Sequence, residues 1–303
     1  MATNGIVKKL GSDGPTIIPF DGLEPKWTTP GATEGGFLRW LISWVGGPKG
    51  YVNPSLGQSL ISENICVGYM KLLAGNRQKG LHTHSIVEIY LVLRGELEGY
   101  DGLGHIHRAG PMDLIYIPVG VPHAVRATTL EDVELIWIHD GVEVKGTSIY
   151  YWDPETVPKV GGIDVLRFND MHPSWEAPKA KQSPFLRWVV NFVGGKEGFI
   201  NHDRDHAIVS EKVALGVEVI LSGSGQVRHS LPGAAQCYVL LQGSVTVEAA
   251  DHHGASSTLK RLDALWVPGG AVHALKNVGQ ESAVVFWCYE RPQKEGSVVY
   301  ELE

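Results

Sequence analysis

The feature that most constrains the fold is an internal repeat of the sequence. Residues 37–53, which read FLRWLISWVGGPKGYVN, return at residues 185–201 as FLRWVVNFVGGKEGFIN, 148 positions later. The similarity continues along the chain, and the offset grows to 150 where His123 aligns with His273. A period of this length is typical of a duplicated domain and not of a solenoid, whose repeats span about 20–50 residues. We therefore expect two domains of one fold within the 303 residues of the chain.

The limits of the two copies predict the domain bounds. We expect an N-terminal domain, including an N-terminal arm, at residues 1–150 and a C-terminal domain at residues 185–303. Residues 151–184, which include the Pro-containing segment HPSWEAPKAKQSP, are interpreted as a packed linker between the two. Both domains then have an ordinary size for an independent folding unit.

Composition and local pattern predict strands and turns in both copies. The chain contains 37 Gly and 17 Pro, which suit many tight turns between short strands. Segments rich in β-branched and aromatic residues are the strand candidates of the first copy, at residues 65–73, 87–100, 113–119 and 133–140. Residues 37–46 could form either a short helix or a strand. The expected fold class is all-β.

Charge and hydropathy argue against several classes of partner. The net charge is −7 and no cluster of Lys and Arg stands out, which argues against nucleic acid. No apolar stretch reaches the roughly 18 residues of a membrane-spanning helix, and the first residues lack the apolar core of a signal peptide. Cys66, Cys237 and Cys288 are widely separated and form no CxxC motif. We expect reduced, mostly buried thiols and a cytoplasmic protein.

Four side chains of the first copy predict a metal site. His82, His84 and Glu88 stand at positions i, i+2 and i+6, so in a strand they point to one face. His123 follows the turn-forming sequence PVGVP and would come from a neighbouring strand. Three imidazoles and one carboxylate suit a divalent first-row metal ion and leave coordination positions open for a substrate.

The same residues resemble the two sequence motifs of the cupin superfamily. The matching residues are His82, His84, Glu88 and Gly95 in the first motif and Pro118, Gly120 and His123 in the second. The sequence departs from the pattern at Gly75, which stands one place early, and at Met112 and Ala127, where the family usually has Gly and Asn. Those positions shape turns and bind no metal. The resemblance implies a bicupin, with two tandem cupin barrels, each a double-stranded β-helix or jelly roll.

The second copy has lost most of the metal motif. Aligned without gaps, it has Ser230, Pro232 and Gln236 in place of the first two His and the Glu. His273 remains, and His229 stands one place out of register. We expect a degenerate C-terminal barrel that binds no metal tightly and serves as a structural partner.

Several other residues are candidates for the pocket around the metal. Tyr90 shares the strand parity of Glu88 and is expected to line the pocket, and Tyr116 is a second candidate. His139 shares parity with Trp137 and could contact substrate or hydrogen-bond in the core. Aromatic walls with a few polar groups are usual for small-molecule sites.

Three further features have a structural interpretation. The segment Gly104–His107 imitates His-x-His but lacks a following Glu, which favours an exposed hairpin. The pair at residues 252–253 resembles the equivalent hairpin tip of the second copy. The pairs Arg39–Trp40 and Arg187–Trp188 occur in both copies, so we interpret them as structural, since the second copy lacks the metal motif.

The resemblance and the ligand set predict a metal-dependent enzyme that acts on a small organic substrate. We expect one divalent ion per chain, with Fe(II) favoured and Mn(II), Zn(II) or Ni(II) as alternatives. Our first expectation is an Fe(II) dioxygenase, an oxidoreductase that cleaves an enolisable or phenolic compound. The alternatives are a non-redox lyase, isomerase or cyclase, or a small-molecule-binding cupin without catalysis. Glu88, Tyr90 and His139 are the catalytic candidates, with Glu88 as a possible general base, and a homodimer is expected.

Overall fold

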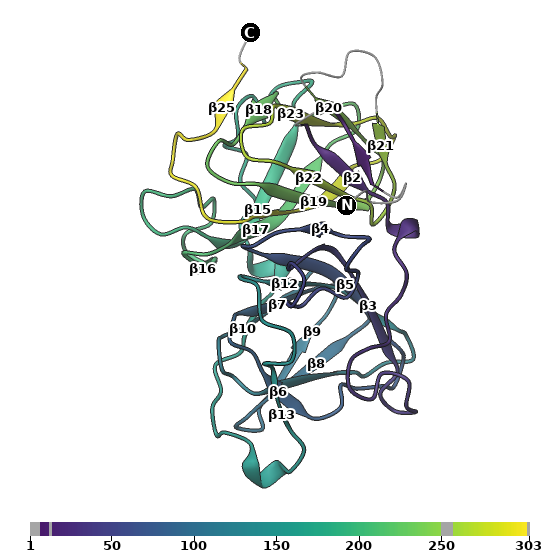
Figure 1. Ribbon diagram of the computed structural model, residues 1–303. Coiled ribbons are helices and arrows are strands. Elements are labelled where there is room, and N and C mark those ends of the chain that lie inside the picture. Colours follow the sequence, from purple (N-terminus) through teal and green to yellow (C-terminus); the bar gives the residue numbers. More distant parts are fainter. Residues whose placement is uncertain (1–6, 12–13, 250–256, 302–303) are drawn as a thin grey trace. The chain divides into compact units, whose positions relative to one another are not determined.

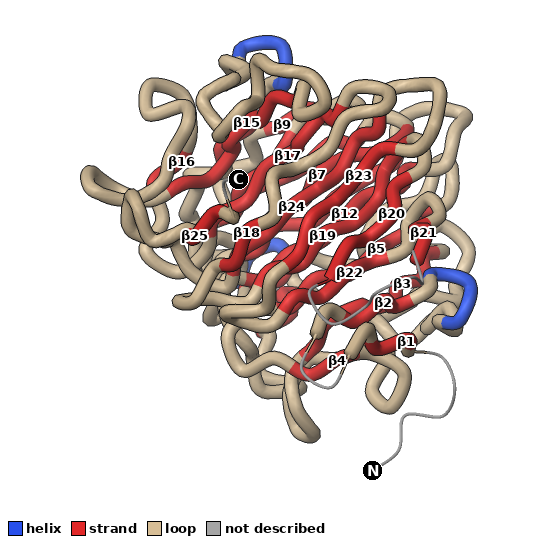
Figure 2. The backbone as a smooth tube through the Cα atoms, turned by 90° about the horizontal axis from the view of Figure 1, so that it is seen from above, coloured by secondary structure: helices blue, strands red, loops and turns tan. Residues whose placement is uncertain are grey.

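The computed structural model describes residues 7–11, 14–249 and 257–301. Within these ranges the chain forms strands, turns and three short 3-10 helices, and no α-helix. Figure 2 shows strands running throughout the molecule and helical turns only between them. The all-β prediction is confirmed. In this part of the chain no helix has the length and apolar character needed to cross a membrane.

The chain divides into two compact units, each built from two sheets. The N-terminal unit comprises Leu23–Asp170, and the C-terminal unit comprises Met1–Gly22 together with Met171–Glu303. Figure 1 labels most of their strands. In each unit a larger and a smaller sheet form a jelly-roll barrel, as the sequence predicts; the pairing is antiparallel except where β3 pairs with β4 and β15 with β16.

The N-terminal unit contains strands β3 to β14 and the 3-10 helices η2 (Pro154–Thr156) and η3 (Phe168–Asp170). The strands are β3 (Arg39–Gly46), β4 (Leu60–Ile61), β5 (Cys66–Leu72), β6 (Leu81–Thr83), β7 (Glu88–Arg94), β8 (Leu97–Asp101), β9 (Ile106–Ala109), β10 (Leu114–Ile117), β11 (His123–Ala127), β12 (Val133–His139), β13 (Ile149–Tyr151) and β14 (Asp164–Leu166). The larger sheet has the order β14-β10-β7-β12-β5-β3-β4, and the smaller has the order β13-β6-β11-β8-β9.

The C-terminal unit repeats this plan with β15 to β25 and adds two strands from the start of the chain. They are β1 (Lys8–Lys9), β2 (Thr16–Ile18), β15 (Arg187–Gly194), β16 (Ile208–Val209), β17 (Ala214–Ile220), β18 (His229–Ser230), β19 (Gln236–Gln242), β20 (Val245–Ala249), β21 (Ser257–Leu259), β22 (Ala264–Val267), β23 (His273–Asn277), β24 (Ala283–Tyr289) and β25 (Val299–Tyr300), with helix η1 at Phe20–Gly22. The sheet orders are β1-β2-β22-β19-β24-β17-β15-β16 and β21-β20-β23-β18-β25.

The units depart from the predicted domain bounds at two places. β2 pairs antiparallel with β22 of the C-terminal unit, with Ile17 opposite Leu265, although the sequence interpretation assigned this arm to the N-terminal barrel. β14, which falls in the predicted linker, pairs with β10 and belongs to the N-terminal unit. An edge strand presents unpaired backbone N–H and C=O groups, and it pairs with a segment that offers partners for them. That segment need not be close in the sequence.

Two local predictions are resolved by the structure. Residues 37–46, for which a helix and a strand were both open, contain strand β3. The candidate strand at 87–100 is two strands, β7 and β8, separated by a turn at Gly95 with φ of 75°. An added Cβ at Gly95 would lie 2.7 Å from the carbonyl oxygen of Asp132, so this tight hairpin requires glycine.

The pairing of β7 with β12 positions the interior of the N-terminal barrel. Glu88 lies opposite His139, and Tyr90 lies opposite Trp137. Because side chains alternate along a strand, these four share the inward face. The outward neighbour Ile89 is also fully buried. The three cysteines are free and buried, as predicted.

Candidate metal centre

The four side chains singled out in the first copy meet inside the N-terminal barrel. β6 carries His82, and His84 follows one residue after the end of that strand; Glu88 opens β7 and His123 opens β11. The register places His123 opposite His82. One donor atom from each of the four residues lies within 4.8 Å of the others, and His84 alone is not fully buried. The structure therefore brings together every residue of the expected ligand set.

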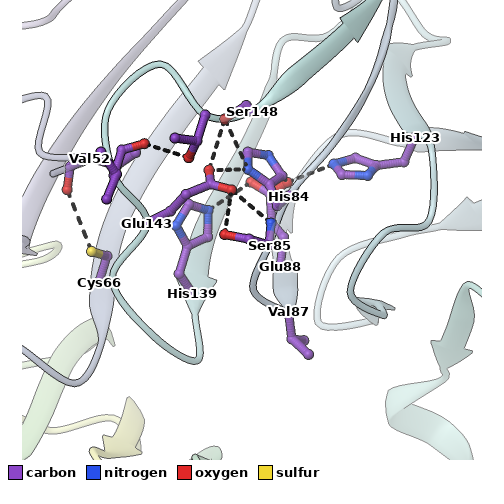
Figure 3. Close-up of polar contacts among 12 residues, drawn as sticks. Val52, Cys66, His84, Ser85, Val87, Glu88, His123, His139, Glu143 and Ser148 are labelled. Carbon is purple, nitrogen blue, oxygen red and sulfur yellow. Dashed lines mark hydrogen bonds and ion pairs between the residues drawn. The ribbon is translucent and has the colours of Figure 1, made fainter.

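The carboxylate of Glu88 lies at the centre of the cluster (Figure 3). Its Oε2 is 2.7 Å from Nε2 of His123 and 3.3 Å from Nε2 of His84, and its Oε1 is 3.3 Å from Nε2 of His139. Burial alone would raise the pKa of Glu88, but the charge of His84 and the hydrogen bonds of His123 and His139 hold it well below its usual range. Glu88 is therefore anionic at neutral pH, as a carboxylate metal ligand must be.

Glu143, which the sequence interpretation missed, orients His84. Its Oε2 lies 2.7 Å from Nδ1 of His84, and its Oε1 accepts a 2.7 Å hydrogen bond from the backbone N–H of Ser85. The hydroxyl of Ser148 donates to Oε2 at 2.8 Å (Figure 3). A carboxylate behind a ligating imidazole fixes the ring and increases its basicity. No local pattern marks Glu143, because it follows β12 and is 59 residues from His84 in the sequence.

The two carboxylates set the protonation of His84. Burial alone would lower the pKa of His84, but Glu88 and Glu143 raise it to about 10. Burial likewise opposes the ionised form of Glu143, yet its bonds with His84 and the neighbouring serine groups lower its pKa to about 2. A metal ion entering the cluster must displace the proton from His84, so metal binding and proton release are coupled.

The remaining two imidazoles have environments that fit a metal. Nδ1 of His123 lies 2.9 Å from the carbonyl oxygen of Val121, and this contact orients the ring so that Nε2 points to Glu88 at the centre of the cluster. His82 stacks on Tyr150 at 5.0 Å and 12° between the rings. Burial, followed by the imidazoles of His123 and His84, holds the pKa of His82 well below its usual value. Its Nδ1 is buried with no hydrogen-bond partner among the described residues, and a neutral imidazole with an unpaired nitrogen fits a metal ligand.

The cluster opens into a cavity of about 420 Å³ inside the N-terminal barrel. Tyr90 lines it, as strand parity predicts, and so do Trp137 and His139, whereas Tyr116, the second candidate, is not among the lining residues. Arg39, which we interpreted as structural, also lines this cavity. The volume lies within the range of small-molecule sites, which is about 300–1,000 Å³.

The ungapped alignment of the two copies assigned the wrong residues of the C-terminal barrel to the positions of His82 and His84. His229 lies opposite His273 as His82 lies opposite His123, so His229 is in register and the assignment of Ser230 to that position was wrong. A single-residue deletion before His229 shifts the copy by one position, and one extra residue between Leu231 and Gln236 restores the original offset. The backbone bond from Gly270 to Leu231 repeats the bond from Gly120 to His84.

The second barrel therefore keeps two imidazoles and replaces the other two ligands. Leu231 occupies the position of His84, and Gln236 occupies that of Glu88. The hydroxyl of Tyr238 donates to Oε1 of Gln236 at 2.6 Å and lies 3.2 Å from Nε2 of His273. Burial lowers the pKa of both His229 and His273, so both are neutral. The corresponding cavity measures only about 60 Å³.

Two other groups of His and Asp lie away from the cavity. Asp101 accepts hydrogen bonds from the backbone of His105 and approaches the ring of His107 at 3.2 Å, within the turn between β8 and β9. This hairpin was predicted, and the exposed ring of His105 agrees with that prediction. Asp203 lies 2.8 Å from His206 in the C-terminal unit. The pair His252–His253 lies outside the described residues.

Comparison with known proteins matches the region of the metal cluster to a family. The cupin domain family model matches residues 68–139. Oxalate decarboxylase OxdC of Bacillus subtilis (strain 168) is 24% identical over 260 residues, which cover 74% of this chain. The match covers 66% of that enzyme, which is just under two thirds of its length.

Solved structures share the two-barrel fold. The structure of oxalate decarboxylase from Bacillus subtilis at pH 4.6 aligns with a TM-score of 0.60 and 17% identity, over 98% of this chain and 81% of the other. A formate complex of oxalate decarboxylase from Lactobacillus farciminis aligns with a TM-score of 0.61 and 14% identity, over 97% and 90%. A further structure of the Bacillus subtilis enzyme, concerned with its Mn(II) centres, aligns with a TM-score of 0.60 at 17% identity, over 97% and 81%.

Proposed function

This chain belongs to the cupin superfamily as a bicupin, and we propose that its N-terminal barrel is a metal-dependent enzyme of the non-redox lyase type. The observation that carries the proposal is the convergence of three imidazoles and one carboxylate on a cavity of about 420 Å³. A divalent ion and a small organic substrate both fit this arrangement. The likeness to oxalate decarboxylase supports a lyase over the Fe(II) dioxygenase that we first expected.

The proposed ligands are His82, His84, Glu88 and His123. When bound, a divalent ion supplies Lewis acidity, which polarises a substrate oxygen and stabilises developing negative charge without a change of redox state. We propose Mn(II) in preference to Fe(II), because a related bicupin is characterised by its Mn(II) centres and this donor set accepts either ion.

The surrounding residues of the chain orient the substrate and move protons. Burial, followed by the charge of Glu88, holds the pKa of Tyr90 well above its usual value, so its hydroxyl stays protonated and can donate a hydrogen bond into the cavity. His139 lines the same cavity, and its Nδ1 is buried without a partner among the described residues. We assign to His139 the transfer of a proton to or from the substrate, and to Glu143 the orientation of His84.

The test combines metal analysis with turnover under anaerobic conditions. Chain purified without added metal is analysed for its elements, and apo-protein is then supplied with Mn(II), Fe(II) or Zn(II) and assayed against a panel of small organic acids. We expect turnover to persist without O₂ when Mn(II) is supplied. Activity that requires O₂ and is restored by Fe(II) alone would reject the lyase and support the dioxygenase.

A further inference from the structure

A buried arginine lines the wall of the metal-site cavity. Arg39 on β3 is only 3% exposed, and its side chain faces the same cavity as the metal cluster. Its Nε donates a 2.9 Å hydrogen bond to the hydroxyl of Thr29. Arg39 also hydrogen-bonds with the hydroxyl of Tyr150, the residue that stacks on His82. Among the described residues no carboxylate forms an ion pair with Arg39.

The C-terminal barrel shows how the same arginine is neutralised when it is structural. Nη1 of Arg187, the counterpart of Arg39, lies 2.5 Å from Oε1 of Glu218, and both side chains are buried. Gln226 donates to the other oxygen of Glu218 at 2.6 Å. Arg187 is therefore neutralised by a carboxylate of its own barrel, in a cavity of only about 60 Å³, although its buried Nε has no hydrogen-bond partner among the described residues.

The N-terminal barrel lacks the residue that would neutralise its arginine. Glu218 lies opposite Val189 in the pairing of β15 with β17, and Met70 lies opposite Leu41 in the matching pairing of β3 with β5. Met70 is thus the counterpart of Glu218, and it also lines the larger cavity. Because Met70 stands where the C-terminal barrel has Glu218, the N-terminal barrel lacks the internal carboxylate and has space beside the guanidinium of Arg39.

The charges that face the cavity favour an anion. Arg39 and Lys145 are its two cationic side chains, and Glu88 is its one carboxylate among the described lining residues. Glu88 is a proposed metal ligand, so its charge is opposed by that of the ion. A buried guanidinium without a counter-ion is costly, and a planar oxyanion that accepts two parallel N–H groups would offset that cost.

We propose that Arg39 binds a carboxylate group of the substrate, so that the enzyme acts on a small organic acid. The inference rests on the proposed function in that it places the substrate in the same cavity. Arg39 holds one carboxylate while the remainder of the molecule extends toward the cluster of His82, His84, Glu88 and His123. The assignment makes Arg39 a specificity-determining residue, and Arg187 its structural counterpart.

Calorimetric titration of the metal-loaded, full-length chain with malonate and with its neutral diamide tests the assignment. We expect malonate to bind and the diamide to bind at least about tenfold more weakly, because a charge-assisted pair is lost. Arg39→Met should weaken malonate binding by at least about tenfold and leave diamide binding unchanged. Met70→Glu should have the same effect, because it supplies the N-terminal arginine with the carboxylate that Arg187 already has.

The matched control removes the corresponding pair from the other barrel. The double variant Arg187→Met with Glu218→Met should bind malonate as the unmodified chain does, because its cavity is too small for the ligand. Metal content and thermal unfolding are measured for every variant. If Arg39→Met does not fold, Met70→Glu still decides the question.

The outcomes separate this inference from the proposed function. Equal malonate affinity in the unmodified chain and in folded, metal-loaded Met70→Glu and Arg39→Met would overturn the role of Arg39 and leave the metal enzyme untouched. Malonate binding that depends on Arg39, in a chain that turns over none of the acids tested, would count against the lyase and support the carboxylate site.

Discussion

The two barrels of this chain share one fold, but they differ in whether a buried arginine is paired with a carboxylate of the same barrel. In the C-terminal barrel Arg187 pairs with Glu218, and the hydroxyl of Tyr238 bridges toward His273. In the N-terminal barrel the corresponding polar groups face a cavity of about 420 Å³ instead of about 60 Å³. A buried charge that is paired with a carboxylate of its own barrel needs no ligand to neutralise it. The corresponding interior without that carboxylate is available to a metal ion and a ligand.

The largest effect is expected when the N-terminal cluster is given the residues of the C-terminal one. His84→Leu with Glu88→Gln removes one imidazole and the anionic ligand, so metal affinity should fall by more than about 100-fold, since loss of supporting residues alone costs about 10–100-fold. Elemental analysis should show the bound metal falling from about one ion per chain to near zero, with loss of turnover. Gln236→Ala is the matched control and should leave the metal content unchanged. Full metal retention in the double variant would place the ion elsewhere.

The second prediction concerns the internal ion pair of the C-terminal barrel. Glu218→Met leaves the buried Arg187 without its carboxylate and should lower the free energy of unfolding by about 3–5 kcal/mol. Adding Arg187→Met should recover most of that loss, because an apolar pair of similar size replaces the ion pair. Denaturant unfolding of the single and double variants measures both values. If Glu218→Met left the free energy of unfolding unchanged, Arg187 would not need a counter-ion in the core. The contrast with Arg39 would then be weaker.

A smaller effect is expected from the carboxylate that orients His84. Glu143→Gln keeps an acceptor for the N–H of Ser85 but removes the charge behind the imidazole, so metal affinity should fall by about 10–100-fold. Competition with a chelator of known affinity provides the measurement. Ser148→Ala removes only one hydrogen bond to the carboxylate and should have a lesser effect. An unchanged affinity in Glu143→Gln would show that ring orientation does not depend on this carboxylate.

The smallest effect is expected at the retained imidazoles of the C-terminal barrel. His273→Ala should leave metal stoichiometry unchanged at about one ion per chain, because Leu231 and Gln236 have replaced the other two ligands there. The matched variant His123→Ala should lose the ion. A stoichiometry near two in the unmodified chain, reduced to one by His273→Ala, would contradict the reading of the second barrel as metal-free.

Much of the fold and of the metal cluster follows from local sequence patterns. The repeat predicts two domains, and the motif residues His82, His84 and Glu88 meet as expected. They do not lie on one face of a single strand, however, because His82 is on β6 of the smaller sheet and Glu88 opens β7 of the larger sheet. Strand alternation correctly places Tyr90 in the cavity, but Tyr116, the second candidate, does not line it. The inference about Tyr90 succeeds because Glu88 and Tyr90 lie two residues apart on one strand, whose side chains alternate between its faces.

Other features depend on which distant segments meet, and the sequence gives no local sign of them. The deletion before His229 cannot be located without the pairing of β18 with β23. Glu143 becomes important because the chain after β12 returns to His84. β2 joins the C-terminal sheet although it precedes the N-terminal one in the chain.

The arginine that occurs in both copies shows which properties the sequence determines and which depend on the tertiary structure. The sequence by itself determines two β-barrels, a metal-type donor set in the first and its loss from the second. Only the tertiary structure decides that Arg187 meets Glu218 whereas Arg39 faces a cavity beside Met70. The physical reason is that the cost of a buried charge depends on the groups around it in space, and those groups come from separate strands.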